Sequence, residues 1–183
     1  GWKAINESDM LLKPDLDTAV LDPFFAQTTL TLVADVCEPS TGERYNRCPR
    51  SIAKAAEAYM QSLGVGDTAY FGPEAEFFIF DDVRFEQGMN KGYYFLDSSE
   101  GPYNTGTDYE TGNLGHRPGV KGGYFPVPPV DSGQDIRSEM LAIMGEYGIQ
   151  PEKHHHEVAP SQHELGFKYN TLVKCGDYMQ IYK

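Results

Sequence analysis

The sequence has few basic side chains and no long apolar run. Lys and Arg together number 15, against 27 Asp and Glu, which gives a formal net charge of −12. Nucleic-acid backbones and anionic membranes both bind basic patches, so this balance disfavours either as a partner. An acidic excess serves either solubility or cation binding, and composition alone does not separate the two. No apolar stretch approaches the ~18 residues of a transmembrane helix, so we expect no membrane-spanning segment.

Cysteine is also scarce. Cys37, Cys48 and Cys175 are odd in number, and none of them forms a CxxC pair. A disulfide framework is dense and even-numbered, so we interpret the three as reduced thiols of a cytoplasmic protein. A length of 183 residues with 40% hydrophobic side chains suits one sizeable domain or two small ones and argues against disorder.

Hydrophobic periodicity predicts the main elements. Apolar residues alternate within residues 26–38 and aromatic residues crowd residues 68–86, so each segment is predicted to be a strand. Helical stripes predict helices over residues 49–64 and 131–148, and from about residue 170 to the end. Helices and long loops separate the strands without a regular βα alternation, so the predicted class is α+β.

Local signals refine these elements. Pro49 suits the first position of a helix, and either Asp131 or Ser132 is predicted to cap the next one. Residues 88–130 are rich in Gly, Pro, Asn, Asp and Ser and are predicted to form one long loop. The tyrosines of this loop favour an ordered, packed segment; they are Tyr93, Tyr94, Tyr103, Tyr109 and Tyr124.

Two carboxylates stand two residues apart in the stretch "GPEAEFF". On a strand, Glu74 and Glu76 would share one face with Cα atoms roughly 6.5–7 Å apart, while Phe77 would face the core. The pair fits either a metal-binding surface or the exposed polar face of an edge strand, and the second is the commoner case for this motif alone.

Four of the five histidines lie in "KHHHEVAPSQHE", residues 153–164. If residues 153–158 form a strand, His155 and Glu157 share one face and the neighbouring histidines point to the other, so the three cannot bind one ion. An HExxH zinc motif is excluded because position 160 is Pro. The turn residues that follow predict a hairpin, whose return strand places Glu164 near Glu157.

These patterns together predict an acidic concave surface formed by Glu74, Glu76, Glu157 and Glu164. Clustered carboxylates repel one another unless cations neutralise them, and two divalent ions carry the matching charge. Oxygen ligands suit Mg²⁺ or Mn²⁺ better than Zn²⁺, and such ions support phosphoryl transfer from ATP. The residues alone therefore favour a two-metal, nucleotide-using enzyme.

Three stretches resemble the bacterial type I glutamine synthetase family: "FGPEAEFFIFDD", "HRPGVKGGYFPVPPVDSGQDIRSEM" and "KHHHEVAPSQHELGFKYNTLVKCGDYMQIYK". The resemblance implies a fragment. Residues 1–48 would be the tail of a β-grasp N-terminal domain, and residues 49–183 the first part of an antiparallel β-sheet or barrel catalytic domain flanked by helices. With the family's remaining site residues absent, we expect the 183-residue chain alone to be inactive.

The resemblance also implies residue roles. Glu76, Glu157 and Glu164 would ligate the tighter metal, and Glu74 the metal among the ATP phosphates. His155 and Glu157 would line the reacting centre. The residues on the nucleotide side would be Tyr124, Glu152 and Tyr169. On its position alone, Tyr124 is more often a packing aromatic in a proline-rich turn.

The implied reaction joins ammonia to L-glutamate at the expense of ATP, through γ-glutamyl phosphate, with two Mg²⁺ or Mn²⁺ ions per site. The family implies a cytoplasmic dodecamer of two hexameric rings with active sites between subunits. Two alternatives stay open: a ligase that joins glutamate to a polyamine or alkylamine on the same fold, and a noncatalytic metal-binding assembly module.

Overall fold

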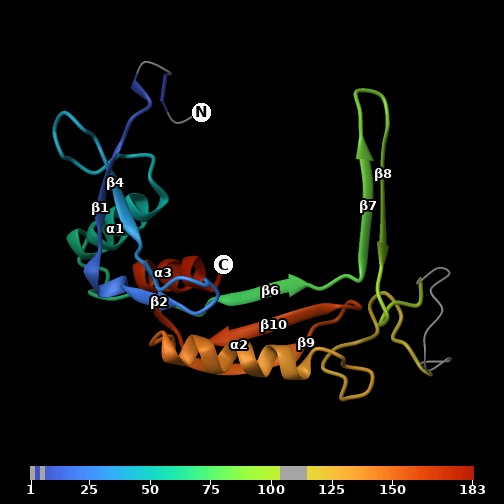
Figure 1. The fold of residues 1–183 in the computed structure, drawn as a ribbon. Coiled ribbons are helices and arrows are strands. Elements are labelled where there is room, and N and C mark those ends of the chain that lie inside the picture. The colour runs from blue at the N-terminus through green and yellow to red at the C-terminus, as the bar shows by residue number, and fades with distance from the viewer. Residues whose placement is uncertain (1–2, 5–6, 104–114) are drawn as a thin grey trace. The chain divides into compact units, whose positions relative to one another are not determined.

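The computed structural model describes residues 3–4, 7–103 and 115–183 (Figure 1). It divides into two units, one formed by residues 1–73 with 168–183 and the other by residues 74–167. Both combine short antiparallel strands with α-helices, which confirms the α+β class. The division predicted after residue 48 stays a prediction. None of the helices in the described part of the chain has the length and apolar character needed to cross a bilayer.

The strands near the N-terminus pair antiparallel. β1 (Leu11–Pro14) pairs with β4 (Ala34–Cys37). β2 (Val20–Asp22) pairs with β3 (Thr29–Thr31), and a 3-10 helix, η2 (Leu16–Thr18), precedes β2.

The single strand predicted over residues 26–38 is therefore wrong. The chain leaves one pairing after β3 and enters another at β4. Between them the N–H of Val33 donates to the Thr18 hydroxyl at 2.9 Å, and its carbonyl accepts from Asp15 N at 2.9 Å. These bonds turn the backbone, so the alternating apolar residues do not share one face.

The helices of this first unit follow the sequence signals closely. α1 (Pro49–Ser62) begins at the predicted proline. α3 (Leu172–Tyr182) packs against α1, and it follows a short antiparallel pair between β5 (Tyr70–Phe71) and β11 (Asn170–Thr171).

One arginine joins the helices to the strand segment. Arg50 donates from Nε to Asp177 Oδ1 at 2.8 Å and from Nη1 to Asp35 Oδ1 at 2.8 Å. Its Nη2 also reaches Asp15 Oδ2 at 2.5 Å. The bond from Arg50, more than the opposing effect of burial, holds the pKa of Asp15 below its usual value. The unit is thus tied together by a part-buried charge cluster.

The second unit is built on a three-stranded antiparallel sheet. β10 (Gln162–Phe167) is central, with β6 (Glu74–Phe78) on one side and β9 (Pro151–His156) on the other. α2 (Gln134–Glu146) packs along β9 and β10 (Figure 1). The core between them includes Ala75, Met144, Ile149, Leu165 and Phe167.

A separate hairpin joins β7 (Asp82–Gln87) to β8 (Gly92–Asp97), which corrects two predictions. The strand predicted over residues 68–86 is three strands, because the backbone changes partner: Ile79 N donates to Ser161 O, whereas Asp81 N donates to Asp97 O. The long loop predicted from residue 88 contains β8.

The tyrosines of that segment are not packed as predicted. The exposed fractions of Tyr93, Tyr94, Tyr103 and Tyr124 are 49%, 74%, 38% and 55%. Tyr109 lies outside the described residues.

Candidate metal centre

The strand register of the three-stranded sheet gathers acidic residues on one face. Glu76 lies directly opposite Glu164, and Glu74 lies opposite Gly166. On the other side of β10, His155 lies opposite Glu164. Alternate residues of a strand share a face, so β6, β9 and β10 each contribute to the same surface, which we call the front face.

The side chains meet in two overlapping trios. Ligand atoms of His155, Glu157 and Glu164 all lie within 4.8 Å of one another, and so do those of Glu74, Glu76 and Glu164. Glu164 belongs to both trios and is 4% exposed. The structure thus brings together the four carboxylates that the sequence predicted, with one histidine among them.

Glu157 reaches the front face from the turn that follows β9. Its Oε2 accepts from Val158 N at 2.8 Å, while Oε1 lies 3.8 Å from His155 Nδ1. Its backbone N–H donates to Gln162 O at 2.7 Å, which closes the start of the turn. One bond therefore fixes the side chain, and the other fixes the backbone that carries it.

The electrostatics of the front face favour a cation. Burial raises the pKa of Glu164, and the nearby Glu157 and Glu74 carboxylates raise it further. Both effects penalise the ionised form of the group. A bound divalent cation would remove the repulsion and restore the carboxylate.

His155 adds a second sign that a ligand belongs here. Its Nδ1 contacts the His156 carbonyl at 3.2 Å, which can only accept, so Nδ1 carries the hydrogen. The other nitrogen, Nε2, is buried without a hydrogen-bond partner among the described residues and lies 3.5 Å from Glu164 Oε2. A hydrogen on Nε2 or a bound cation would make this approach favourable. This donor set fits Mg²⁺ or Mn²⁺.

Gln162 is a site residue that sequence reasoning missed. Its Nε2 donates to Glu76 Oε2 at 2.6 Å, and its Oε1 accepts from Ala159 N at 3.2 Å. The side chain links the turn to a carboxylate of β6. Its place two residues before Glu164, on the same face of the return strand, was the available signal.

The opposite, back face of the hairpin carries the other histidines, His154, His156 and His163. Arg137 of α2 donates to His154 Nδ1 at 3.2 Å and to His163 Nδ1 at 2.8 Å, so both rings accept there and are neutral. Burial, and then the charge of Arg137, lowers the pKa of His163 to about 4. The prediction that His154 and His156 point away from the carboxylates agrees with this arrangement.

The predicted cap of α2 has a different role. α2 begins after Gly133, which makes no side-chain cap. Asp131 accepts from Gly133 N at 3.0 Å and binds Arg137 through both oxygens, at 2.9 and 2.5 Å. A Cβ on Gly133 would lie 2.4 Å from the His163 ring, so glycine is required where helix and hairpin approach.

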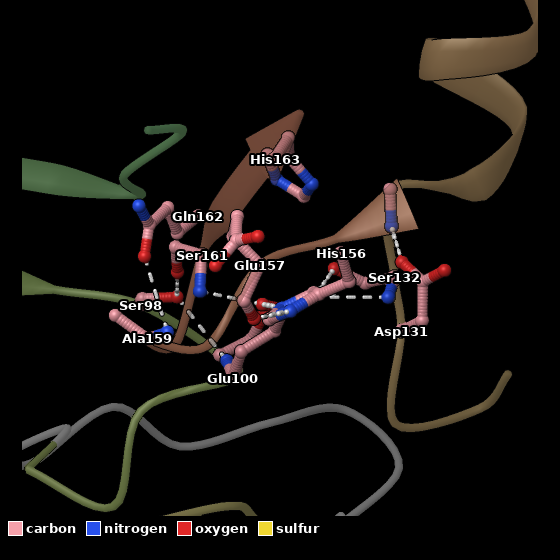
Figure 2. A network of polar contacts seen from close by, with 12 residues as sticks. Ser98, Glu100, Asp131, Ser132, His156, Glu157, Ala159, Ser161, Gln162 and His163 are labelled. Carbon is pink, nitrogen blue, oxygen red and sulfur yellow. Dashed lines mark hydrogen bonds and ion pairs between the residues drawn. The ribbon is translucent and has the colours of Figure 1, made fainter. Parts of the chain in front are cut away.

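His156 is the charged member of the back face. Its Nδ1 contacts Glu157 O at 2.5 Å and its Nε2 contacts Glu100 Oε2 at 2.7 Å. Both partners only accept, so both ring nitrogens carry hydrogen. Burial opposes this charge, but the Glu100 bond outweighs it and raises the pKa of His156. Figure 2 shows the Glu100 carboxylate against this ring.

The three residues predicted to contact the nucleotide are divided between the two units, whereas the carboxylates all lie in the second. Tyr124 lies edge-on to His155, with ring centroids 5.4 Å apart. Glu152 is exposed near the start of β9, beside a shift in the pairing register, and belongs to neither trio. Tyr169 is in the first unit, where it contacts the Tyr70 ring edge-on. Their nucleotide roles stay predictions.

Comparison with known proteins identifies the family. The model of the glutamine synthetase catalytic domain matches residues 46–183, and that of the glutamine synthetase beta-Grasp domain matches residues 1–39. The chain belongs to the glutamine synthetase family.

Its relatives within the glutamine synthetase family are much longer. The glutamine synthetases of Azospirillum brasilense and Salmonella typhimurium are 69% and 57% identical to it; each alignment covers all of this chain and 39% of the relative. A cryoEM structure of Plasmodium falciparum glutamine synthetase superposes with a TM-score of 0.84 at 26% identity, over 98% of this chain and 35% of that one.

Proposed function

We propose that this chain forms part of a glutamate–ammonia ligase, which uses ATP to join ammonia to L-glutamate through γ-glutamyl phosphate. The observation that carries the proposal is the pair of carboxylate trios that share the buried Glu164. Relatives 57–69% identical to the chain are named glutamine synthetase, and the chain spans 39% of their length. The amine-ligase and noncatalytic alternatives have no comparable support.

The front face supplies the metal ligands. We assign Glu76, Glu157 and Glu164 to one Mg²⁺ or Mn²⁺ ion and Glu74 to a second. Such ions, when bound, orient the glutamate carboxylate and neutralise charge on the transferring phosphoryl group. The shared position of Glu164 in both trios supports a paired site.

The chain's own side chains prepare the site for its substrates. Val158 N holds one Glu157 oxygen, so the other stays directed at the cluster. His155 Nε2, which makes no hydrogen bond to a described residue, can hold a proton or bind a substrate oxygen. The acidic surface attracts ammonium, which must lose a proton before it can attack. By family resemblance we assign Tyr124, Glu152 and Tyr169 to the nucleotide side; the Tyr124 ring lies edge-on to His155.

The same resemblance supports two further parts of the proposal. We infer a cytoplasmic protein, and we infer active sites between subunits of a dodecamer made of two hexameric rings. An acidic chain with three free cysteines suits that location.

A chimera tests the activity. This chain replaces the matching 39% of the Azospirillum brasilense relative, and glutamine formation is measured with ATP and Mg²⁺. We expect activity within about tenfold of the parent, because the chain should reproduce the parent's active-site geometry; a displacement of about 1 Å would cost roughly 100-fold. Activity with putrescine or methylamine but not with ammonium would establish the amine ligase instead. Mn²⁺ binding without any product would establish the noncatalytic module.

A further inference from the structure

The turn between β9 and β10 is held from the back face by one buried acid, Glu100. This residue lies in the loop after β8 and is 6% exposed. Its Oε2 accepts from Ser161 N at 2.7 Å and from His156 Nε2 at 2.7 Å. Its Oε1 accepts from Ser132 N at 2.9 Å and from Ser132 Oγ at 2.6 Å. Each carboxylate oxygen thus binds two donors, and the donors come from two separate segments (Figure 2).

Ser161 is the strained residue of that turn. Its φ is +63°, in the left-handed region that glycine adopts readily and other residues rarely do. Its side chain is 1% exposed and its hydroxyl contacts the Ser98 hydroxyl. Its carbonyl accepts from Ile79 N at 3.1 Å. The bond to Glu100 therefore helps to keep a non-glycine residue in a conformation that it would otherwise leave.

The segment held in this way runs between the ligands of the front face. Glu157 stands at one end of the turn, and Gln162 and Glu164 follow Ser161 at the other. His156, the second contact of Glu100 in the hairpin, directly precedes Glu157. A relaxed turn would displace ligands from both strands, although Glu100 itself touches none of them.

We propose that Glu100 is a positioning residue for the metal centre, which acts by holding Ser161 and His156 so that Glu157 and Glu164 converge. This inference rests on the proposed metal-binding function of the front face. Residues that orient metal ligands from behind affect metal affinity by about 10–100-fold when substituted.

Mn²⁺ binding to the 183-residue chain, measured by electron paramagnetic resonance, tests the inference. Glu100→Gln is expected to weaken Mn²⁺ binding about tenfold, because the amide replaces one acceptor with a donor that faces Ser132 or His156. Glu100→Asp keeps the charge and is expected to cause a smaller loss, of about threefold. If circular dichroism shows that Glu100→Gln does not fold, Glu100→Asp is the variant that tests the inference.

A rescue separates positioning from general destabilisation. If Glu100 acts through Ser161, then Ser161→Gly should restore affinity in the Glu100→Gln chain to within about threefold of wild type, because glycine adopts the left-handed conformation without strain. Asp177→Asn is the matched control: it weakens a part-buried ion pair of Arg50 in the other unit and should change Mn²⁺ affinity less than about twofold.

The outcomes distinguish the two claims. Saturable Mn²⁺ binding that Glu164→Gln does not weaken, or no binding at all, overturns the metal site and this inference with it. Binding that depends on Glu164 but is unchanged by Glu100→Gln overturns only the inference. A loss of affinity that Asp177→Asn reproduces also overturns it, and a loss that Ser161→Gly does not recover overturns the part of the inference that acts through Ser161.

Discussion

The two faces of the β9–β10 hairpin differ in how their acidic side chains are paired. On the back face, Asp131 is matched by Arg137 and Glu100 by His156, with bonds of 2.5–2.9 Å. On the front face, the carboxylates that meet at Glu164 face one another, and His155 Nε2 lies 3.5 Å from Glu164 Oε2 without a hydrogen bond to any described residue. Neighbouring residues of one strand thus lie in two different electrostatic environments. The paired side is complete as it stands, whereas the carboxylates of the front face repel one another until a proton or a cation is bound.

The largest expected effect separates function from stability. Glu164→Gln should lower Mn²⁺ affinity, and ligase activity in the chimera, by at least ~100-fold, since it removes a ligand shared by both trios. The same change should leave the free energy of unfolding unchanged or raise it slightly, because the neutral amide ends a carboxylate repulsion. Urea unfolding without metal checks this. A clear loss of stability would mean that the front face is a structural cluster.

Substitution of a charged residue on the back face should instead lower the free energy of unfolding. Arg137→Met leaves Asp131 buried without its cation, and we expect a loss of about 3–5 kcal/mol in the free energy of unfolding. The double variant Arg137→Met/Asp131→Asn should recover part of this loss, because no unpaired charge remains. Equal stabilities of the single variant and wild type in urea unfolding would contradict the comparison.

The pH dependence of stability should also have opposite signs on the two faces. Burial alone would raise the pKa of Glu100, but the bonds from His156 and Ser132 outweigh it and lower the pKa to about 2. Its contribution is therefore present above about pH 4.5 and is lost as the pH falls towards 2; the shift corresponds to about 3 kcal/mol. Glu164, with a raised pKa, instead destabilises the metal-free fold as the pH rises through that pKa.

Urea unfolding at several pH values measures both contributions. The stability difference between wild type and Glu100→Gln should shrink as the pH falls below 4.5, whereas Glu164→Gln should gain stability relative to wild type as the pH rises. A difference that does not change with pH for either variant would remove the electrostatic distinction between the faces.

The smallest effect is expected at Gln162. Gln162→Ala removes the bond to Glu76, and Mn²⁺ affinity should fall about threefold while stability changes by less than ~0.5 kcal/mol. Gln61→Ala, which removes a similar exposed bond to Asp67 O in the other unit, is the control and should leave Mn²⁺ affinity unchanged. Calorimetric titration compares the two.

The front face could be predicted from the sequence because its chemistry is local. Glu74 with Glu76, and His155 with Glu157, are two residues apart, and period-two geometry alone assigns them to a face. Similarly, α1 begins at Pro49 because the signal for its first turn lies within the helix itself.

The contacts of the back face could not be predicted from the sequence because the partners are distant in the chain. Glu100 is separated from His156 by 56 residues and lies in a segment that was predicted as plain loop. The strands predicted over residues 26–38 and 68–86 failed for a related reason: each segment changes its pairing partner midway, and local alternation carries no information about partners.

The backbone changes its hydrogen-bonding partner between Ile79 and Asp81. The three-stranded sheet before this point and the β7–β8 hairpin after it should therefore differ in how well they tolerate inserted residues. Only the three residues 79–81 stand between β6, which carries Glu74 and Glu76, and the hairpin of β7 and β8. A residue inserted at the exposed tip of that hairpin, near Met89, shifts no pairing of β6 with β10. The hairpin can therefore diverge in length or carry a probe, while a residue inserted within β6, between Glu74 and Glu76, would send the two carboxylates to opposite faces.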